Sequence, residues 1–277
     1  MSIVAQTIDL NHVYPGGVNA LKNINLTLEK GVRVAIVGQN GSGKTTLSKH
    51  FNGLLRPTSG KILINGTDVA TKKTGELASL VGYVFQNPNY QLFSNTVKDE
   101  IEFGLKNMNL KAEEIRERLI ETVDFFDLRK IAKKQPLTFS SGVRKLVALA
   151  SVYAMRPPIL FLDEPTTGQD HPGKEKIGQM ILKMSQEGHT IVVITHDMNF
   201  VMRFAERVIV MAEGEIVKDA SPREIFCDSV TMEKAHLNPP QVFSLARRLN
   251  SFGIPLDTSN PNEMAEAIAQ RRATSLE

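Results

Sequence analysis

The chain has 277 residues, of which 42% are hydrophobic and 23% are charged, and both fractions are ordinary for a packed soluble protein. Its 33 basic and 30 acidic residues leave a net charge of +3, which is too balanced to indicate binding to nucleic acid or to an anionic membrane surface. The single cysteine, Cys227, excludes an internal disulfide, and no apolar run approaches the roughly 18 residues of a membrane-spanning helix. We therefore expect a soluble cytoplasmic protein with one large α/β domain and a small appendage.

Two stretches at the start of the chain predict β-strands. Apolar and polar residues alternate over residues 3–10 and again over residues 20–28, as they do in strands with one buried face. A loop that carries Tyr14 joins the two stretches, and a third apolar run follows at residues 32–37. This order predicts an antiparallel β patch beside the strand that comes next.

Residues 38–45 have the pattern G-x-x-x-x-G-K-T, between that apolar run and the start of a predicted helix. This is the P-loop in its strand–loop–helix context, where glycines let backbone N–H groups turn toward a polyphosphate and the helix N-terminus adds its positive end. The flanking strand and helix disfavour an accidental glycine-rich turn. Lys44 is predicted to reach the phosphates, and the Thr45 hydroxyl to bind Mg²⁺. The predicted phosphate-binding residues are Gly38, Gln39, Asn40, Gly41, Ser42, Gly43, Lys44, Thr45 and Thr46.

Two further residues are candidates for the same nucleotide site. Tyr14 is a candidate for stacking on an adenine ring, although a tyrosine at the end of a strand is more often a half-buried core residue. Gln86 follows a predicted strand at residues 81–85 and opens a polar and aromatic loop. Near a phosphate site, Gln86 would contact Mg²⁺ or the attacking water, and solvation of the loop is the alternative.

The period of the apolar residues becomes helical from Thr96 to about Leu128. Thr96 with Asp99 three residues later is an N-cap signal, and apolar residues at spacings of three and four form stripes opposite Glu and Arg. The charged side predicts a surface that faces solvent rather than a binding site. We predict an inserted helical subdomain over about residues 87–155.

Two buried strands in the second half of the chain end in residues that can carry chemistry. Residues 159–162 end in Asp163 and Glu164, the Walker B arrangement, in which Asp163 holds Mg²⁺ through water and Glu164 orients or deprotonates the attacking water. Residues 190–195 end at His196, at the carboxyl end of a strand where α/β sheets bind ligands. This placement favours contact with the γ-phosphate over a purely structural histidine.

The sequence changes character after residue 220. Pro222 occupies the first position of a short predicted helix, a pair of prolines at 239–240 breaks the chain, and residues 241–249 and 262–269 are amphipathic. We predict that residues 221–277 form a helical extension that holds two chains together. The apolar face expected to do so consists of Val242, Leu245, Ala246 and Leu249.

The motifs over about residues 3–220 together resemble the ATP-binding cassette (ABC) family. The stretch from residue 84 to residue 104 and the tail at residues 239–249 are similar to one branch, the energy-coupling factor importers, which bring vitamins and transition-metal ions into prokaryotes. The features that separate the family from other P-loop proteins are the Gln loop at Gln86, the signature at Ser140-Ser141-Gly142, the D-loop at Gly168-Gln169-Asp170 and the switch histidine His196.

The resemblance implies an α/β P-loop NTPase fold, with a mostly parallel central sheet, an antiparallel β subdomain, an inserted α-helical subdomain and a small helical C-terminal extension. It implies that residues 1–220 form the nucleotide-binding domain, which binds ATP and Mg²⁺ between two cassettes that face head to tail. The second cassette is identical or different, and Ser140, Ser141, Gly142 and Asp170 serve its nucleotide.

The resemblance also implies ATP hydrolysis coupled to transport at the cytoplasmic face of a prokaryotic cell membrane. The expected partners are a transmembrane coupling subunit and a substrate-binding membrane subunit, and no nucleic acid. The alternative is a soluble cassette of the repair or translation type, but such proteins carry a long coiled coil or two P-loops, which this chain lacks. A P-loop kinase is disfavoured by the signature and by His196.

The signature and the D-loop depart from the usual pattern of the family. Residues 139–143 read Phe-Ser-Ser-Gly-Val where Leu-Ser-Gly-Gly-Gln is usual, and Gln169 stands where leucine is usual. Because Ser140 and Gly142 remain, contact with a phosphate is still expected, while the level of activity is left open.

Overall fold

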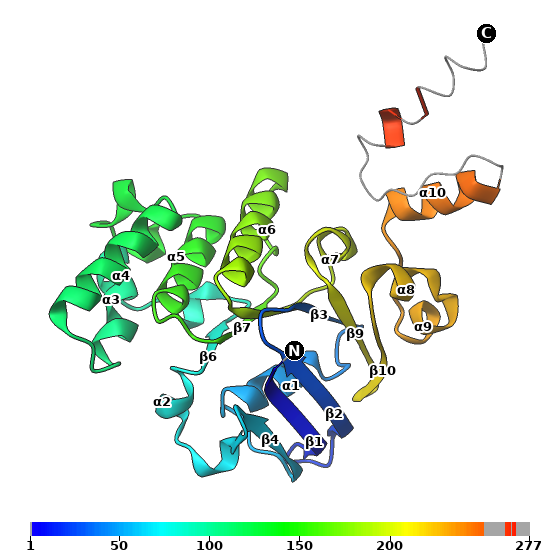
Figure 1. Ribbon diagram of the computed structural model, residues 1–277, viewed down its shortest axis with the longest axis horizontal. Helices are drawn as coiled ribbons and strands as arrows, with labels where there is room; N and C mark the ends of the chain where they lie inside the picture. The colour runs from blue at the N-terminus through cyan, green and yellow to red at the C-terminus, as the bar shows by residue number, and fades with distance from the viewer. Residues whose placement is uncertain (1, 252–263, 267, 270–277) are drawn as a thin grey trace.

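The computed structural model describes residues 2–251, 264–266 and 268–269. Two β-sheets pack together through one hydrophobic core, and helices cover the other face of the larger sheet (Figure 1). Within the described residues, no helix is both long and apolar enough to cross a bilayer.

The smaller sheet is antiparallel and confirms the predicted β patch. Its strand order is β2-β1-β4-β5, with bounds β1 Ile3–Val13, β2 Asn19–Glu29, β4 Ser59–Ile64 and β5 Thr67–Asp68. β1 runs three residues beyond the predicted end, because its last part continues to pair with β2, as in the register of His12 with Leu21.

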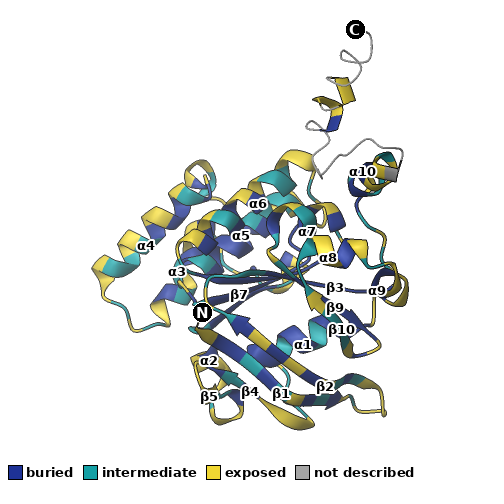
Figure 2. Ribbon diagram, turned by 45° about the vertical axis from the view of Figure 1, so that its right-hand side comes forward, coloured by how far each residue is buried: buried dark blue, intermediate teal, exposed yellow. Residues whose placement is uncertain are grey.

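The larger sheet is parallel except for one edge strand. Its order is β10-β9-β3-β8-β7-β6, with bounds β10 Glu215–Ala220, β9 Arg207–Ala212, β3 Arg33–Val37, β8 Thr190–Ile194, β7 Ile159–Asp163 and β6 Val81–Val84. β10 forms an antiparallel hairpin with β9. Every residue of β7 and β8 is buried, as expected for parallel strands covered on both faces (Figure 2).

Alternate residues of the large sheet enter different cores. Val34 and Ile36 of β3 face the antiparallel sheet and helix α1 (Lys44–Phe51), whereas Ala35 and Val37 face helices on the opposite side. α5 (Ser141–Tyr153), α6 (His171–Gln186) and α7 (Met198–Phe204) cover that opposite side.

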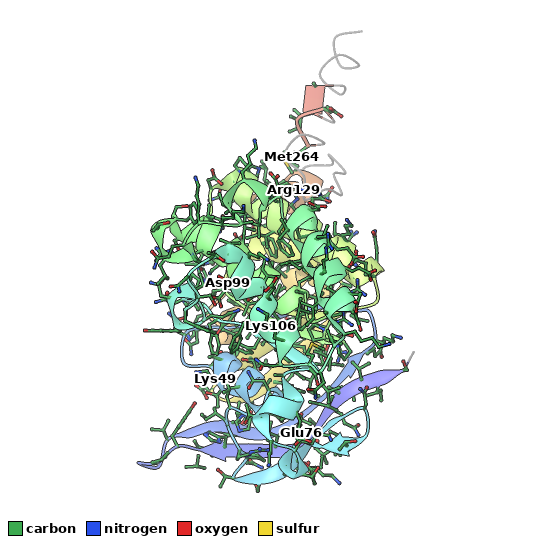
Figure 3. The ribbon with its side chains drawn as sticks, turned by 90° about the vertical axis from the view of Figure 1, so that its left-hand side faces the viewer. Lys49, Glu76, Asp99, Lys106, Arg129 and Met264 are labelled. Atoms are coloured by element: carbon green, nitrogen blue, oxygen red, sulfur yellow. The ribbon has the colours of Figure 1, made fainter. Side chains whose placement is uncertain are left out.

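The inserted helices stand at one end of the molecule. α3 (Val97–Lys106) and α4 (Ala112–Phe125) pack against α5, and the short α2 (Thr74–Leu77) lies beside the antiparallel sheet. The Thr96 hydroxyl accepts a hydrogen bond from the Asp99 amide at 3.0 Å, which confirms the predicted cap. Asp99 and Lys106 of α3 and Arg129 beyond α4 are exposed, as the charge pattern predicts (Figure 3).

The C-terminal extension is packed partly onto the main domain. α8 (Pro222–Cys227) and α9 (Ser229–Lys234) bury Ile225, Phe226 and Met232 in one core with Val208 and Val210 of β9. The division at residue 220 therefore coincides with the end of β10 but not with the edge of a hydrophobic core, and its functional meaning stays a prediction.

The predicted apolar face lies on α10 (Gln241–Ser251). Val242, Ala246 and Leu249 pack around Met264, whereas Leu245 is 47% exposed. The amphipathic stretch predicted at residues 262–269 lies partly outside the described residues, since 262, 263 and 267 are among those left out.

Candidate active site

The P-loop joins β3 to α1 in a path that requires glycine. Gly38 and Gly43 have positive φ angles of 148° and 101°. A Cβ atom on Gly38 would lie 2.1 Å from the Met211 carbonyl oxygen, and one on Gly43 would lie 2.6 Å from the Ala20 carbonyl oxygen. The backbone of the loop therefore lies close to β9 and β2 and leaves its other side open as a cradle.

A cavity of about 1060 Å³ lies over this cradle. It meets the carboxyl ends of β3, β7 and β8, which is where α/β sheets place ligands. The structure thus brings together most of the predicted site. Predicted residues that line the cavity are Tyr14, Gly38, Gln39, Asn40, Gly41, Gly43, Lys44, Thr45, Thr46, Gln86, Asp163, Glu164 and His196.

Lys44 is held for contact with an anion. Its Nζ atom donates to the carbonyl oxygens of Gly38 and Gln39 at 2.8 and 2.7 Å, and lies 3.3 Å from the Ser42 hydroxyl. Burial lowers the pKa of Lys44, while the nearby carboxylates of Glu164 and Asp163 act to raise it. Phosphate oxygens would replace these carbonyl partners with stronger charge-assisted acceptors.

Asp163 and Thr45 supply the hard oxygen ligands that Mg²⁺ prefers. The Thr45 hydroxyl donates to Asp163 Oδ2 at 3.3 Å, so the two groups converge at one point beside the P-loop. The Tyr83 hydroxyl donates to the same oxygen at 3.0 Å and lies 3.1 Å from the Ser48 hydroxyl. Burial raises the pKa of Asp163, although the hydrogen bonds from Tyr83 and Thr45 act to lower it.

Glu164 stands at the turn that follows β7, in a left-handed conformation with φ 49°. Its Oε1 atom is 2.9 Å from His196 Nδ1, and its Oε2 atom is 3.4 Å from the hydroxyls of Thr195 and Thr167. The carboxylate is thereby oriented by three side chains, next to Lys44 and Asp163. An oriented carboxylate at this place can accept a proton from water that attacks a bound phosphate.

The adenine candidate Tyr14 lines the cavity. Its hydroxyl is 3.1 Å from the Thr46 hydroxyl, and its ring meets the His12 ring edge-on at 4.6 Å between centroids. His12 in turn contacts the buried His50 of α1. The stacking role of Tyr14 stays a prediction, as does the contact of Gln86 with Mg²⁺ or water.

The signature and D-loop residues do not line the cavity of their own chain in the described part of the structure. Ser140 is the N-cap residue of α5, but its side chain makes no capping hydrogen bond. Asp170 caps α6 by accepting from the Gly173 amide at 2.9 Å. Ser140 and Ser141 are both exposed, so their polar groups are available to a second molecule.

Several residues of the site were not predicted from the sequence. Tyr83, Ser48 and Lys145 make hydrogen bonds to residues that are distant in the sequence. Their positions in an apolar strand or in a helix do not indicate these contacts. His236, Leu237 and Asn238, which follow α9, also line the cavity. The C-terminal extension therefore reaches the P-loop cavity of its own chain.

Comparison with known proteins matches this geometry to one family. The ABC transporter family matches residues 21–167. The chain is 41% identical to the energy-coupling factor transporter ATP-binding protein EcfA of Methanocaldococcus jannaschii, over 92% of each protein. It is 40% identical to a putative ABC transporter ATP-binding protein of Caldanaerobacter subterraneus, with 89% of this chain matched, but it spans only 43% of that longer relative.

A solved structure gives the same result. CbiO1 of Clostridium perfringens, part of the ABC transporter complex CbiONQ, superposes with a TM-score of 0.77 and 36% identity, covering 89% of this chain and 100% of that one. With the P-loop, Asp163, Glu164 and His196 assembled in one cavity, these matches place the protein among the ATPases of the ABC transporter family, in the group of energy-coupling factor transporter ATP-binding proteins.

Proposed function

We propose that this chain binds ATP in its P-loop cavity and hydrolyses it with Glu164 as the group that activates water. The observation that carries the proposal is the orientation of the Glu164 carboxylate by His196, Thr195 and Thr167, beside Lys44 and Asp163.

The residues around the cavity fit a magnesium–nucleotide complex. Lys44 neutralises charge on the β- and γ-phosphates, and Tyr14 stacks on the base. Thr45 and Asp163 would hold Mg²⁺, with Gln86 as a further oxygen donor. When bound, the ion would offset the negative charge that develops on the phosphate oxygens. Glu164 orients the attacking water and accepts its proton, and His196 contacts the γ-phosphate.

A second cassette, identical or different, completes the site. The Ser140 hydroxyl and the amide of Gly142, at the N-terminus of α5, do not line their own cavity and are placed at a helix end suited to an anion. We assign them, with Ser141 and Asp170, to the nucleotide of the partner cassette. Two chains then face head to tail with two nucleotides between them, and hydrolysis reopens the pair.

The membrane partners of the transporter dock on the side of the inserted helices. A groove of about 370 Å³ there is lined by Phe85, Phe93, Phe103 and Met155. The rings of Phe93 and Phe103 meet at 4.8 Å between centroids, and these residues are 62% and 50% exposed. Exposed apolar surface of this kind marks an interaction site. We propose that a helix of the transmembrane coupling subunit occupies it.

The transported substrate is a vitamin or a transition-metal ion captured by a separate membrane subunit, with the cassettes on the cytoplasmic face of a prokaryotic cell membrane. Co-purification with the membrane subunits, followed by mass spectrometry of the bound ligand, identifies that substrate.

Glu164→Gln tests the hydrolytic role directly. The amide keeps the size and polar contacts of the side chain but cannot accept a proton from water, so ATP binding should persist while turnover falls by about 10²-fold or more. Phosphate release and the sizing profile with Mg·ATP measure the two effects, and an ATP-bound dimer should accumulate. Turnover close to that of the wild type would remove Glu164 from its role.

A further inference from the structure

Lys145 is a buried lysine whose role was not predicted from the sequence. It lies in the second turn of α5, the helix that begins at the signature, and is only 3% exposed. Its Nζ atom donates to the backbone carbonyl oxygen of Glu164 at 2.5 Å. Lysine is almost never fully buried unless its charge is satisfied, so this contact has to be explained.

The surroundings of Lys145 explain why the charge is tolerated. Burial lowers the pKa of Lys145, whereas the carboxylates of Glu164 and Asp163 act to raise it. An ammonium group close to two carboxylates and bonded to a carbonyl oxygen is partly compensated for the water it has lost.

The backbone that Lys145 holds is in a conformation that non-glycine residues avoid. Glu164 has φ 49°, in the left-handed region, and such a residue persists only when its surroundings fix it. Its amide donates to the Ile194 carbonyl oxygen at 2.8 Å, so β8 fixes one side of the residue. Lys145 fixes the other side, through the carbonyl oxygen.

α5 is also attached to the same loop at a second point. The Gln169 side-chain amide donates to the Gly142 carbonyl oxygen at 3.3 Å, and a Cβ atom on Gly142 would lie 3.0 Å from Gln169 Oε1. The first turns of α5 therefore contact the segment from residue 164 to residue 169 at both of its ends. A movement of the signature end of α5 therefore displaces the backbone of Glu164.

We propose that Lys145 is a positioning residue for hydrolysis: it holds the main chain of Glu164 so that the carboxylate faces the cavity, and it makes that placement depend on α5. The inference rests on the proposed role of Glu164. Through it, the signature that meets the nucleotide of the partner is linked to the water-activating group of its own chain.

Lys145→Met removes the donor while it keeps the length of the side chain. The kcat for ATP should fall roughly 10- to 100-fold, as misplacement of a reacting group by about 1 Å does, while the Kd for ATP stays unchanged because the P-loop is not touched. Lys145→Arg, which retains a donor, should recover most of the turnover. Leu149→Ala is the control, since it removes buried packing from the same helix and leaves the hydrogen bond between Lys145 and Glu164 in place. It should lower the melting temperature and leave kcat unchanged.

A double-mutant cycle separates positioning from a general structural role. Because Lys145 acts through Glu164, adding Lys145→Met to Glu164→Gln should lower the residual turnover no further, as is typical of residues that act as a unit. Independent, multiplied losses would overturn the inference, as would equal losses for the Arg and Met variants. If Lys145→Met fails to fold, Lys145→Gln, whose amide is one bond too short to reach the carbonyl oxygen, takes its place in the cycle.

The outcome also separates this inference from the proposed function. If Glu164→Gln retains turnover, the role of Glu164 fails, and this inference fails with it. If Glu164→Gln is inactive while Lys145→Met matches the wild type, only the role of Lys145 is overturned.

Discussion

At the scale of single residues, the Oδ2 atom of Asp163 is held by two hydrogen-bond donors. It accepts hydrogen bonds from Tyr83 and Thr45, and Asp163 and Tyr83 are only 5% and 8% exposed. A carboxylate in such a place depends on its donors, since water does not replace a donor that is lost. In the nucleotide-bound protein Thr45 would turn to Mg²⁺, which leaves Tyr83 to keep the carboxylate in position.

Tyr83→Phe should therefore destabilise the protein by about 1.5–3 kcal/mol, the usual range for a hydrogen bond to a charged buried group. Urea denaturation at pH 7 measures the loss. Tyr153→Phe is the matched control, because the Tyr153 hydroxyl donates to Glu187 at 2.7 Å on an exposed carboxylate that water can solvate. Its loss should stay below about 1 kcal/mol. Equal losses of unfolding free energy for the two variants would contradict the expectation that the buried Asp163 depends on its hydrogen-bond donor more than the exposed Glu187 does.

At the scale of elements, α9 connects the main domain to the loop that lines the cavity. Asp228 caps α9 by accepting from the Thr231 amide at 3.1 Å, and it pairs with Lys218 of β10 at 2.5 Å. α9 is followed by a left-handed residue, His236, with φ 51°. The hydrogen bonds from the His236 and Leu237 amides back to the last turn close a Schellman motif. The position of the cavity-lining loop is therefore set by how α9 is anchored.

Asp228→Asn tests this anchor through its pH dependence. The hydrogen bond from Lys218, and those from Thr231, hold the pKa of Asp228 well below its usual range. A carboxyl whose folded pKa is depressed stabilises the protein above its unfolded pKa of about 3.9, and the stabilisation is lost as the pH falls below that value. The difference in melting temperature between wild type and Asp228→Asn should thus be present at pH 7 and shrink by pH 3.

Glu233→Gln, which removes a charge from the exposed side of the same helix, is the control for Asp228→Asn and should show little difference at either pH. No difference between wild type and Asp228→Asn at either pH would mean that the asparagine still caps α9 and that the pair with Lys218 contributes nothing. A loss of the same size at both pH values would show that the stabilisation does not depend on the charge of Asp228, which would also contradict the prediction.

The elements also show where prediction from the sequence succeeds. The P-loop, Asp163, Glu164 and His196 each lie at the end of a strand. An apolar run followed by polar residues was therefore enough to predict their positions, and no knowledge of the fold was needed. Tyr83 and Lys145 act on residues 80 and 19 positions away along the chain. These contacts form only when β6 and α5 lie beside β7, and no local sequence pattern predicts that arrangement. For the same reason, the sequence did not predict that residues 236–238 line the cavity.

At the scale of the whole molecule, the extension has two parts with different relations to the domain. α8 and α9 complete a core with β3, β9 and α7, and Phe243 of α10 is buried in the same core, 5.9 Å from the ring of Phe226. Beyond this contact, α10 presents Leu245 to solvent and gathers Val242, Ala246 and Leu249 around Met264. A cut after residue 220 would remove most of the extension's core residues, whereas a cut after residue 238 removes Phe243 alone from that core.

We therefore expect a chain that ends at Asn238 to fold and bind ATP but to be a monomer without nucleotide, whereas the full chain is a dimer held by α10. Sedimentation velocity at micromolar concentration, without nucleotide, distinguishes the two. Leu245→Glu is the complementary variant: it leaves the buried Phe243 contact in place and puts a charge on the exposed apolar position, which should separate the dimer without loss of melting temperature. A full-length protein that is already monomeric under these conditions would show that α10 does not hold the cassettes together. In that case only the nucleotide and the membrane subunits would remain to hold the two cassettes together.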